Sequence, residues 1–300
     1  MTTTPITTIS LQGYPVDVLR LELAYPDVQG NKFFKLKYNL STAVEHGYRT
    51  ILTFGGAFSN HVHATATACK QLGLHAIFII RGEDDPDNPT CRYVRELGME
   101  MQFIHREEYK LRNDPAFVRQ LTAQFGDVYV LPEGGTNALA VQGCAEILSG
   151  IADQYDQIVC AVGTGGTLAG IINTKGLTAH VTGVCSLNGQ TDTISPSVQA
   201  YVQPHAQNVQ WKICFDSAFG KYAGFHPELH AYMQQFIAHH AIIPDPIYNG
   251  KMFYQVEHIL KTGAWKNQRI LCIHTGGLQG WEGWHYRYRN KIAQLEACKN

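Results

Sequence analysis

The chain has 300 residues and an apolar fraction of 45%, enough for the cores of one or two domains and too apolar for a disordered protein. Its 24 Lys and Arg residues nearly balance its 25 Asp and Glu residues, so no strong net charge attracts nucleic acid or an anionic membrane. These numbers favour a small molecule as the partner and argue against nucleic acid.

The cysteines and the N-terminus indicate the compartment. None of the eight cysteines shows Cys-x-x-Cys spacing, and most lie in apolar runs, which favours buried free thiols over a disulfide or zinc framework. The start, MTTTPITTISLQ, has neither the basic nor the apolar region of a signal peptide, and no apolar run approaches the ~20 residues of a membrane span. We expect a cytoplasmic protein that contacts no membrane and binds no metal.

Short β-branched runs alternate with stretches of helical period, which is typical of parallel α/β sheets. In chain order, the predicted strands are Thr50–Phe54, Ala76–Ile80, Met101–Ile104, Asp127–Leu131, Asp156–Val162, Val181–Cys185, Val209–Cys214 and Arg269–His274. The predicted helices are His61–Leu72, Thr90–Leu97, Pro115–Phe125, Asn137–Gln154, Thr167–Thr174, Pro227–His240 and Lys251–Thr262. The acidic segment Arg81–Pro89 predicts an exposed loop, and a domain change is expected near Gly134–Gly135. Several strands end in glycine-rich turns, the edge where open α/β sheets bind ligands.

The first candidate segment is GNKFFKL, residues 30–36. Taken alone, this segment is better explained by a helix on which Lys32 faces the solvent. If Phe33, Phe34 and Leu36 partly desolvate it, burial favours the neutral amine, which is the form that attacks an aldehyde.

The second candidate segment, FGGAFSNH, follows a predicted strand and precedes a predicted helix. It can be a βα turn in which Ser59 or Asn60 caps the helix. In a functional interpretation, the hydroxyl, amide and imidazole of Ser59, Asn60 and His61 would recognise a small carboxylate and an aromatic hydroxyl.

The third candidate segment comprises Gly163, Thr164, Gly165, Gly166 and Thr167, again between a predicted strand and a predicted helix. Free backbone N–H groups and two threonine hydroxyls favour an anion site over a plain tight turn. The segment lacks the lysine of a P-loop, and no acidic residue closes the next strand as a dinucleotide would require. A single phosphate is therefore the natural ligand.

Two further segments near the C-terminus carry polar side chains, DPIYNGK at residues 245–251 and IHTGG at residues 273–277. Tyr248, Lys251, His274 and Thr275 are credible site groups, although each is, taken alone, more often structural.

The order of these segments is more specific than any one of them. GNKFFKLKYN, FGGAFSNH, LPEGGTNALAVQG, VGTGGTLAG, DPIYNGK and HTGG follow one another in a chain that resembles the family of 1-aminocyclopropane-1-carboxylate deaminases and D-cysteine desulfhydrases. The resemblance extends from Val16 to Gly277. It implies that the cofactor is pyridoxal 5′-phosphate (PLP).

The resemblance also implies a fold. The family has the tryptophan-synthase-β-like fold (PLP-dependent fold type II), an α/β architecture of two open, twisted, mainly parallel sheets flanked by helices. We expect a large cofactor-binding domain of residues 1–40 plus 146–300 and a small domain of residues 41–145.

Single residues take expected roles from the same resemblance. Lys32 matches the lysine that holds PLP as a Schiff base. Ser59 is expected to touch the substrate, and Asn60 to support the cofactor's 3′-oxygen. Residues 162–167 match the phosphate-binding loop, and Tyr248 matches the tyrosine that faces the substrate.

Two positions separate the activities of the family. Members that open the cyclopropane ring resemble a pattern with glutamate directly after that tyrosine and leucine directly before the final Gly-Gly. This chain has Asn249 and Thr275 there. Threonine is what desulfhydrase-like members show, whereas Asn249 matches neither pattern. A neutral threonine opposite the pyridine nitrogen would leave that nitrogen largely unprotonated, a weaker electron sink that β-elimination can tolerate.

We therefore expect a PLP-dependent lyase or deaminase that acts on a small amino acid, with Lys32, Ser59 and Tyr248 as catalytic residues and Thr275 at the cofactor. The foremost expectation is α,β-elimination from D-cysteine to pyruvate, ammonia and sulfide. Alternatives are 1-aminocyclopropane-1-carboxylate deamination, elimination from D-serine or an L-cysteine-type substrate, and a weakly active PLP-binding amino-acid sensor. A homodimer is the default for a soluble enzyme of this size.

Overall fold

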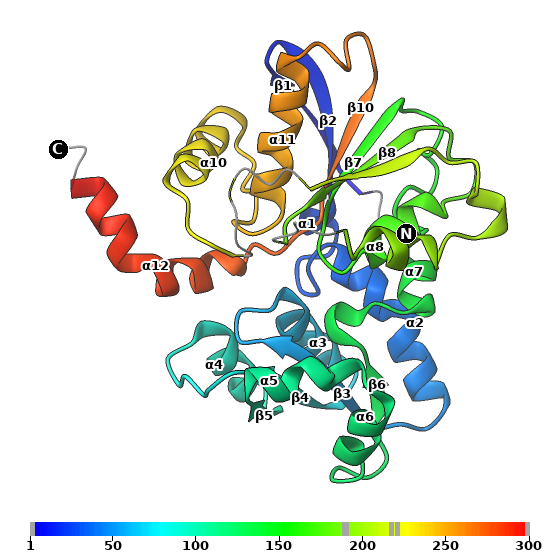
Figure 1. The fold of residues 1–300 in the computed structure, drawn as a ribbon, viewed down its shortest axis with the longest axis vertical. Helices are drawn as coiled ribbons and strands as arrows, with labels where there is room; N and C mark the ends of the chain where they lie inside the picture. The colour runs from blue at the N-terminus through cyan, green and yellow to red at the C-terminus, as the bar shows by residue number, and fades with distance from the viewer. Residues whose placement is uncertain (1–3, 188–191, 216–218, 220–222, 298–300) are drawn as a thin grey trace.

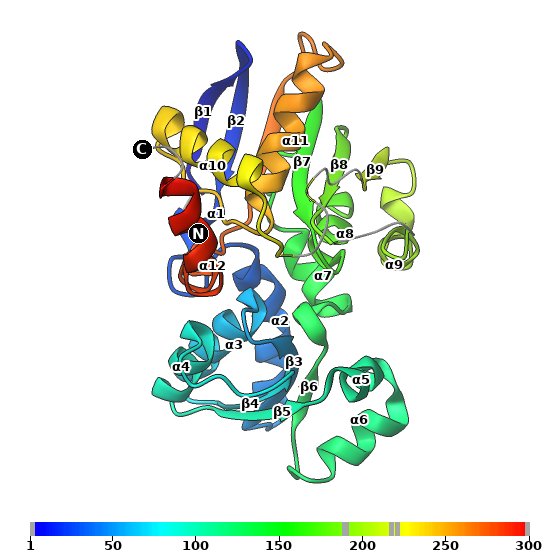
Figure 2. The ribbon, with the colours of Figure 1, turned by 60° about the vertical axis from the view of Figure 1, so that its left-hand side comes forward.

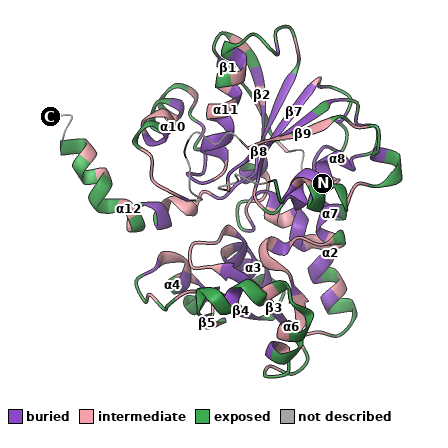
Figure 3. Cartoon of the chain, in the orientation of Figure 1, coloured by how far each residue is buried: buried purple, intermediate pink, exposed green. Residues whose placement is uncertain are grey.

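The computed structural model describes residues 4–187, 192–215, 219 and 223–297. The strands form two sheets, one above the other in Figure 1, and helices cover both faces of each. Buried residues concentrate in the strands and exposed residues on the outer helices (Figure 3). The C-terminal helix α12 (Gly280–Ala297) extends away from the body, at the left of Figure 1.

The larger sheet has six strands in the order β1-β2-β10-β7-β8-β9, all parallel except β1, which pairs antiparallel with β2. The strands are β1 (Ile6–Leu11), β2 (Tyr14–Arg20), β7 (Gln157–Val162), β8 (His180–Cys185), β9 (Trp211–Cys214) and β10 (Ile270–His274). The helices are α1 (Leu21–Ala24), α7 (Ala138–Cys144), α8 (Gly166–Ile172), α9 (Ser195–Gln199), α10 (Pro227–His240) and α11 (Asn249–Lys261). In β7, Ile158 and Cys160 pack with α7 and α8, whereas Val159 and Ala161 pack with α10 and α11. Burial on both faces explains why this strand is a continuous apolar run.

The smaller sheet has four parallel strands in the order β5-β4-β3-β6. The strands are β3 (Thr50–Gly56), β4 (His75–Arg81), β5 (Glu100–Ile104) and β6 (Tyr129–Leu131), and the helices are α3 (Asn60–Gln71), α4 (Pro89–Glu96), α5 (Arg106–Tyr109) and α6 (Pro115–Thr122). Ile51 and Phe78 face α3 and α4, while Leu52 and Ile79 face Leu121 of α6.

Helix α2 (Asn31–Glu45) connects the two sheets and belongs to the core of each (Figure 2). Near its start, Phe34 packs in the core of the larger sheet, and further along the helix, Leu36 and Leu40 pack in the core of the smaller sheet. The helix begins at the cleft described below, so its first turn is held by the larger sheet and its last turns by the smaller one.

The predicted fold class is confirmed, and all eight predicted strands are present, with bounds that differ by one or two residues at some ends. The predicted domain limits remain a prediction. The strands of the smaller sheet all lie between residues 50 and 131, but α2 crosses the predicted limit at residue 40.

The predicted helix Asn137–Gln154 is wrong in its second half. Helix α7 ends at Cys144, and residues 145–154 form successive turns with hydrogen bonds between residues three apart. Gly150, with φ +82°, lies in the left-handed region and interrupts any helix. Ile147, Leu148 and Ala152 are still buried, which is why the apolar spacing resembles that of a helix.

The hairpin of β1 and β2 was not predicted, although a signal for it exists. Gln12 and Gly13, with φ of +53° and +80°, form the two-residue turn between the strands. Two left-handed residues in succession are what a tight hairpin requires. The helices α2 and α12 were also not predicted from the sequence.

Candidate functional site

A cleft of about 750 Å³ lies where the carboxyl ends of strands from both sheets meet. Gly56 and Arg81 end β3 and β4 on one side, and Val162 and Thr275 end or follow β7 and β10 on the other. Parallel strands present their carboxyl ends at one edge, and ligands of open α/β sheets bind there. The segments singled out from the sequence come together at this edge.

Lys32 lies in the first turn of α2, on the wall of the cleft. Gly30 precedes the helix with φ +64°, and a Cβ at this position would lie 2.0 Å from the carbonyl oxygen of Thr275. The backbone N–H of Asn31 donates to that oxygen at 3.1 Å, and the Asn31 amide bonds both the Lys32 amine (3.0 Å) and the hydroxyl of Thr167 (2.8 Å). Burial lowers the pKa of Lys32 to about 8, so a sizeable fraction is the neutral amine near physiological pH.

Lys35 is a second lysine of the site, which sequence reasoning did not select. Its ammonium donates to the carbonyl oxygen of Gly134, to the hydroxyl of Thr136 (2.8 Å) and to that of Thr164 (3.5 Å). Burial, and then the neighbouring charge of Lys32, lowers its pKa to about 7. The signal was the spacing, because residues three apart share one face of a helix.

The predicted phosphate loop, residues 163–167, joins β7 to α8 and lines the cleft. A Cβ on Gly163 would lie 3.1 Å from the ring of Tyr248, and a Cβ on Gly166 would lie 2.9 Å from the hydroxyl of Thr136. Side chains here would fill the space beside the loop, so the glycines keep its backbone N–H groups accessible.

Ser59 and Asn60 lie together at the end of β3, on the cleft wall. The Ser59 hydroxyl oxygen caps α3 by accepting from the backbone N–H of His61 (3.2 Å) and of Val62 (3.4 Å). Its own O–H hydrogen is not needed for this cap. The side-chain oxygen of Asn60 accepts from the Gln279 amide at 2.9 Å.

The predicted substrate residue His61 also lines the cleft, but its ring is buried. The hydroxyl of Thr53 donates to the carbonyl oxygen of Leu131, so it accepts from His61 Nε2 at 2.8 Å, which places the ring hydrogen on that nitrogen. His61 Nδ1 lies 3.4 Å from the hydroxyl of Thr65. Burial, with the charge of Lys35 second, holds the pKa of His61 well below its usual range. His61 is therefore a neutral imidazole whose two nitrogens each lie near a threonine hydroxyl, and its role is to pack beside the cleft.

Asp245 organises the segment that carries Tyr248. Its buried carboxylate accepts from the backbone N–H groups of Ile247 (3.0 Å), Tyr248 (2.9 Å) and Asn249 (2.8 Å), and from the Asn249 amide. The Asn249 oxygen in turn accepts from the backbone N–H (3.1 Å) and the hydroxyl (3.2 Å) of Thr275. Burial raises the pKa of Asp245. Tyr248 and Thr275 line the cleft, whereas Asn249 lies behind them.

Two other candidates from this region do not line the cleft. Lys251 is buried and donates to the carbonyl oxygen of Ser186 at 3.2 Å. His274 is buried between Glu22, 2.9 Å from its Nδ1, and the carbonyl oxygen of Ile243, 2.9 Å from its Nε2. The structure therefore places both behind the wall as support.

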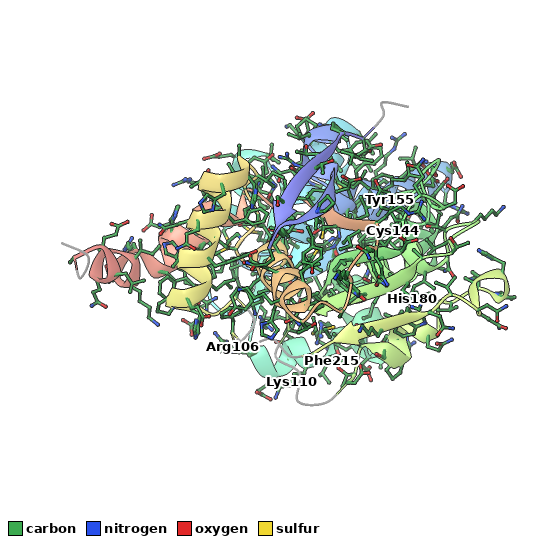
Figure 4. All side chains as sticks on the ribbon, turned by 90° about the horizontal axis from the view of Figure 1, so that it is seen from above. Arg106, Lys110, Cys144, Tyr155, His180 and Phe215 are labelled. Atoms are coloured by element: carbon green, nitrogen blue, oxygen red, sulfur yellow. The ribbon has the colours of Figure 1, made fainter. Side chains whose placement is uncertain are left out.

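The cysteines of the described part of the chain are mostly buried. Six of its cysteines are free and buried: Cys69, Cys91, Cys144, Cys160, Cys185 and Cys272. Burial raises the pKa of Cys144, the last residue of α7, to about 11. In Figure 4, Cys144 lies within the mass of side chains and the exposed Arg106 and Lys110 at its edge. Within the described ranges, no three His, Cys, Asp or Glu side chains gather as a metal site would require. No helix there is long and apolar enough to cross a bilayer.

The residues present fit a group that carries both an aldehyde and a phosphate. Lys32 offers an amine of lowered pKa to the aldehyde, and residues 163–167 with Lys35 offer N–H, hydroxyl and ammonium donors to the phosphate. Asn60 and Thr275 line the same cleft. The glycines of the loop leave room that a Cβ would occupy.

Comparison with known proteins leads to the same chemistry. The model of one protein family, described as pyridoxal-phosphate dependent enzyme, matches residues 4–276. The bifunctional D-cysteine desulfhydrase/1-aminocyclopropane-1-carboxylate deaminase of Arabidopsis thaliana is 31% identical over 92% of this chain and 77% of its own length. The D-cysteine desulfhydrase of Serratia proteamaculans is 26% identical over 91% of this chain and 89% of its own length.

Solved structures extend the likeness to the fold. A crystal structure described as an ACC deaminase homologue superposes with a TM-score of 0.82 at 26% identity, over 98% of this chain and 94% of that one. A fungal L-serine ammonia-lyase from Rhizomucor miehei superposes with a TM-score of 0.64 at 16% identity, over 96% of this chain and 98% of that one, and shares the fold alone.

Proposed function

The chain belongs to the family of pyridoxal-phosphate-dependent enzymes, and from this premise we propose that it is a lyase acting on a small amino acid. The proposed reaction is α,β-elimination from D-cysteine, giving pyruvate, ammonia and sulfide. Deamination of 1-aminocyclopropane-1-carboxylate to 2-oxobutanoate and ammonia is the second candidate, because a bifunctional relative carries both names. The observation that carries the proposal is the Lys32 amine, with its lowered pKa, facing the loop 163–167 across one cleft.

We assign the cofactor contacts to residues of the cleft wall. Lys32 would hold the aldehyde carbon, Lys35 and residues 163–167 would hold the phosphate, Asn60 would donate to the phenolic oxygen, and Thr275 would lie at the ring nitrogen. Pyridoxal phosphate, when bound, supplies an electron-withdrawing ring that takes up charge as the Cα–H bond of the substrate breaks.

Lys32 is proposed to move the Cα proton. Its pKa of about 8 gives a neutral amine in useful amount near neutral pH, and an amine of this pKa can both take and return a proton. Desolvation within the cleft is the largest cause of the lowered pKa, so the same burial that excludes water makes this lysine a base.

Ser59 and Tyr248 are proposed to bind and orient the substrate. The oxygen of Ser59 caps α3, which leaves its O–H free to donate to the substrate carboxylate. Tyr248 is held by the hydrogen bond from its backbone to Asp245 and lies against Gly163, so its ring borders the space above the phosphate loop. A misplacement of either group by about 1 Å could lower the rate about 100-fold.

The neutral side chains around Thr275 favour elimination over ring opening. Asn249 bonds Thr275 through its oxygen, and the nearest carboxylate of that network, Asp245, is occupied by four hydrogen bonds. Beside Thr275, the ring nitrogen would meet a neutral hydroxyl, so a substrate whose leaving group departs readily would suit the site better.

The test is a panel of D- and L-amino acids with the purified protein. Pyruvate with sulfide from D-cysteine supports the first reaction, and 2-oxobutanoate from 1-aminocyclopropane-1-carboxylate supports the second. Borohydride reduction followed by peptide mass spectrometry should place a phosphopyridoxyl group on Lys32, and the Lys32→Ala protein should carry none. A protein that stays colourless with added PLP refutes the proposal, and a spectral change without turnover on any substrate identifies an amino-acid sensor.

We further propose a cytoplasmic homodimer with the domain division 1–40 plus 146–300 and 41–145. The division is supported by the two sheets, which draw their strands from these ranges. The homodimer is supported only by its frequency among soluble enzymes, and sedimentation at several protein concentrations tests it.

A further inference from the structure

The side chain of Asn60 ends in an amide, whose oxygen accepts hydrogen bonds and whose nitrogen donates them. Its Nδ2 lies against Gly277, where a Cβ would be 2.5 Å away, and its Oδ1 accepts from Gln279 Nε2 at 2.9 Å. An amide that turns by half a rotation exchanges a donor for an acceptor with almost no change of shape. Its orientation is therefore set by hydrogen bonds alone.

The segment that carries Gln279 is held by hydrogen bonds of the neighbouring residues. It lies between Gly277 and α12, where the Gly280 N–H donates to the Gly277 carbonyl oxygen at 2.9 Å and the neighbouring Leu278 N–H donates to Gln29 at 2.8 Å. The Trp281 indole N–H, two residues further on, donates to the carbonyl oxygen of Pro244 at 2.9 Å. Gln279 itself lines the cleft.

The position of Gln279 has an energetic cost. Its Oε1 is buried and has no hydrogen-bond partner among the described residues. A buried acceptor without a partner is unfavourable, and such groups are found at sites where another requirement outweighs stability. Here the satisfied end of Gln279 is the donor, and it is directed at Asn60.

We infer that Gln279 is a positioning residue, which turns the Asn60 amide so that its Nδ2–H donates to the phenolic oxygen of the cofactor. The inference rests on the proposed function, which assigns that oxygen to Asn60. A phenolate only accepts hydrogen bonds, so the opposite orientation of Asn60 would oppose two oxygens. It would also leave the Gln279 Nε2 as a buried donor without a partner.

The test is the Gln279→Glu variant, which replaces the donor by a group that only accepts. Asn60 must then turn its Nδ2 toward residue 279 and its Oδ1 toward the cofactor. A hydrogen bond to an ionised group is lost, so the Kd for PLP should rise about tenfold or more. The pH at which the visible band of the bound cofactor changes should shift as well, a readout that does not depend on turnover.

Two controls separate amide orientation from charge and from folding. Gln29→Glu adds the same charge to the cleft wall and keeps the acceptor for the Leu278 N–H, so its Kd should stay within about threefold of the wild type. In an Asn60→Ala background, Gln279→Glu should have no further effect on Kd, because no amide remains to be turned. If Gln279→Glu does not fold, Gln279→Met is used in the same cycle.

The outcomes are distinguishable. A wild-type protein that takes up no PLP on Lys32 overturns the proposed function and the inference together. If the wild type binds PLP but Gln279→Glu behaves like Gln29→Glu, or if its effect persists without Asn60, the inference alone is overturned.

Discussion

Replacing Lys35 by methionine should stabilise the cofactor-free protein and at the same time weaken its hold on PLP. The lysine is buried, and burial with the charge of Lys32 lowers its pKa from 10.5 to about 7. Each tenfold change in protonation is worth about 1.4 kcal/mol, so a charged Lys35 costs the folded state on the order of 5 kcal/mol. Methionine fills similar space without that charge.

The sign of the pH dependence follows from the lowered pKa. Below about pH 7, Lys35 is protonated in both states, and the whole cost is present. Between about pH 7 and 10.5 the unfolded state binds more protons, so the wild type gains stability as the pH rises, and above 10.5 the cost is gone. The advantage of Lys35→Met in free energy of unfolding should therefore shrink by roughly 2–3 kcal/mol between about pH 7 and pH 9.

Urea unfolding of both cofactor-free proteins between about pH 6 and pH 9.5 measures this difference, and titrating groups that are not coupled to Lys35 cancel in it. Lys37→Met is the matched control on the same helix, because Lys37 is more exposed and its hydrogen bond with Glu146 raises its pKa. Its difference from the wild type should stay flat up to about pH 9. The reasoning fails if the Lys35→Met difference is equally flat, or if it grows with pH.

The same Lys35→Met variant should bind PLP more weakly than the wild type. Lys35 donates to Thr136 and to Thr164 of the loop 163–167, so its loss removes a cation next to the proposed phosphate. A hydrogen bond between charged groups contributes about 1.5–3 kcal/mol, which predicts a Kd for PLP at least about tenfold higher. Unchanged affinity would place the phosphate elsewhere.

Three further outcomes are expected. Attachment of PLP to Lys32 should accelerate as the pH rises through about 8, because only the neutral amine attacks, and the visible band of the bound cofactor measures it. A rate that does not change between about pH 6.5 and 9.5 would contradict the lowered pKa of Lys32. Gly30→Ala should lose at least about 2 kcal/mol of unfolding free energy, measured by urea unfolding, because the new methyl would meet the Thr275 carbonyl oxygen at a positive φ. Ser59→Ala should lower kcat/KM about tenfold or more, and Tyr248→Phe should lower kcat more than it raises KM. Steady-state kinetics with the substrate found in the amino-acid panel tests both.

The sequence predicted the sheets better than the helices that join them. Strands such as Gln157–Val162 are apolar throughout because both faces are covered, and this pattern is unambiguous. Helix α2 was not recognised because its apolar residues serve two different cores, so they do not form one stripe. The helix α7 was predicted to be too long for a different reason. The buried turns that follow it repeat apolar residues at nearly helical spacing.

The site residues could also be predicted only in part from the sequence. Lys32, Ser59, Asn60, Tyr248 and the loop 163–167 all reach the cleft, because each follows a strand or starts a helix at the ligand-binding edge. Lys251 and His274 belong to equally polar segments and lie behind the wall, since the register of a side chain within a turn depends on tertiary contacts. No pattern in the sequence distinguishes the two outcomes.

The position of α2 explains how two sheets can form one precise site. Its first turn is anchored to the larger sheet, where Asn31 donates to the Thr275 backbone, and its later turns pack in the core of the smaller sheet. Lys32, the next residue, is therefore held close to the strand end that carries Thr275. Asn60 belongs to the smaller sheet, and its bond to Gln279 is a direct contact across the cleft. The position of Lys32 is thus tied to the larger sheet by a backbone contact, whereas the contact between Asn60 and Gln279 joins the two sheets directly.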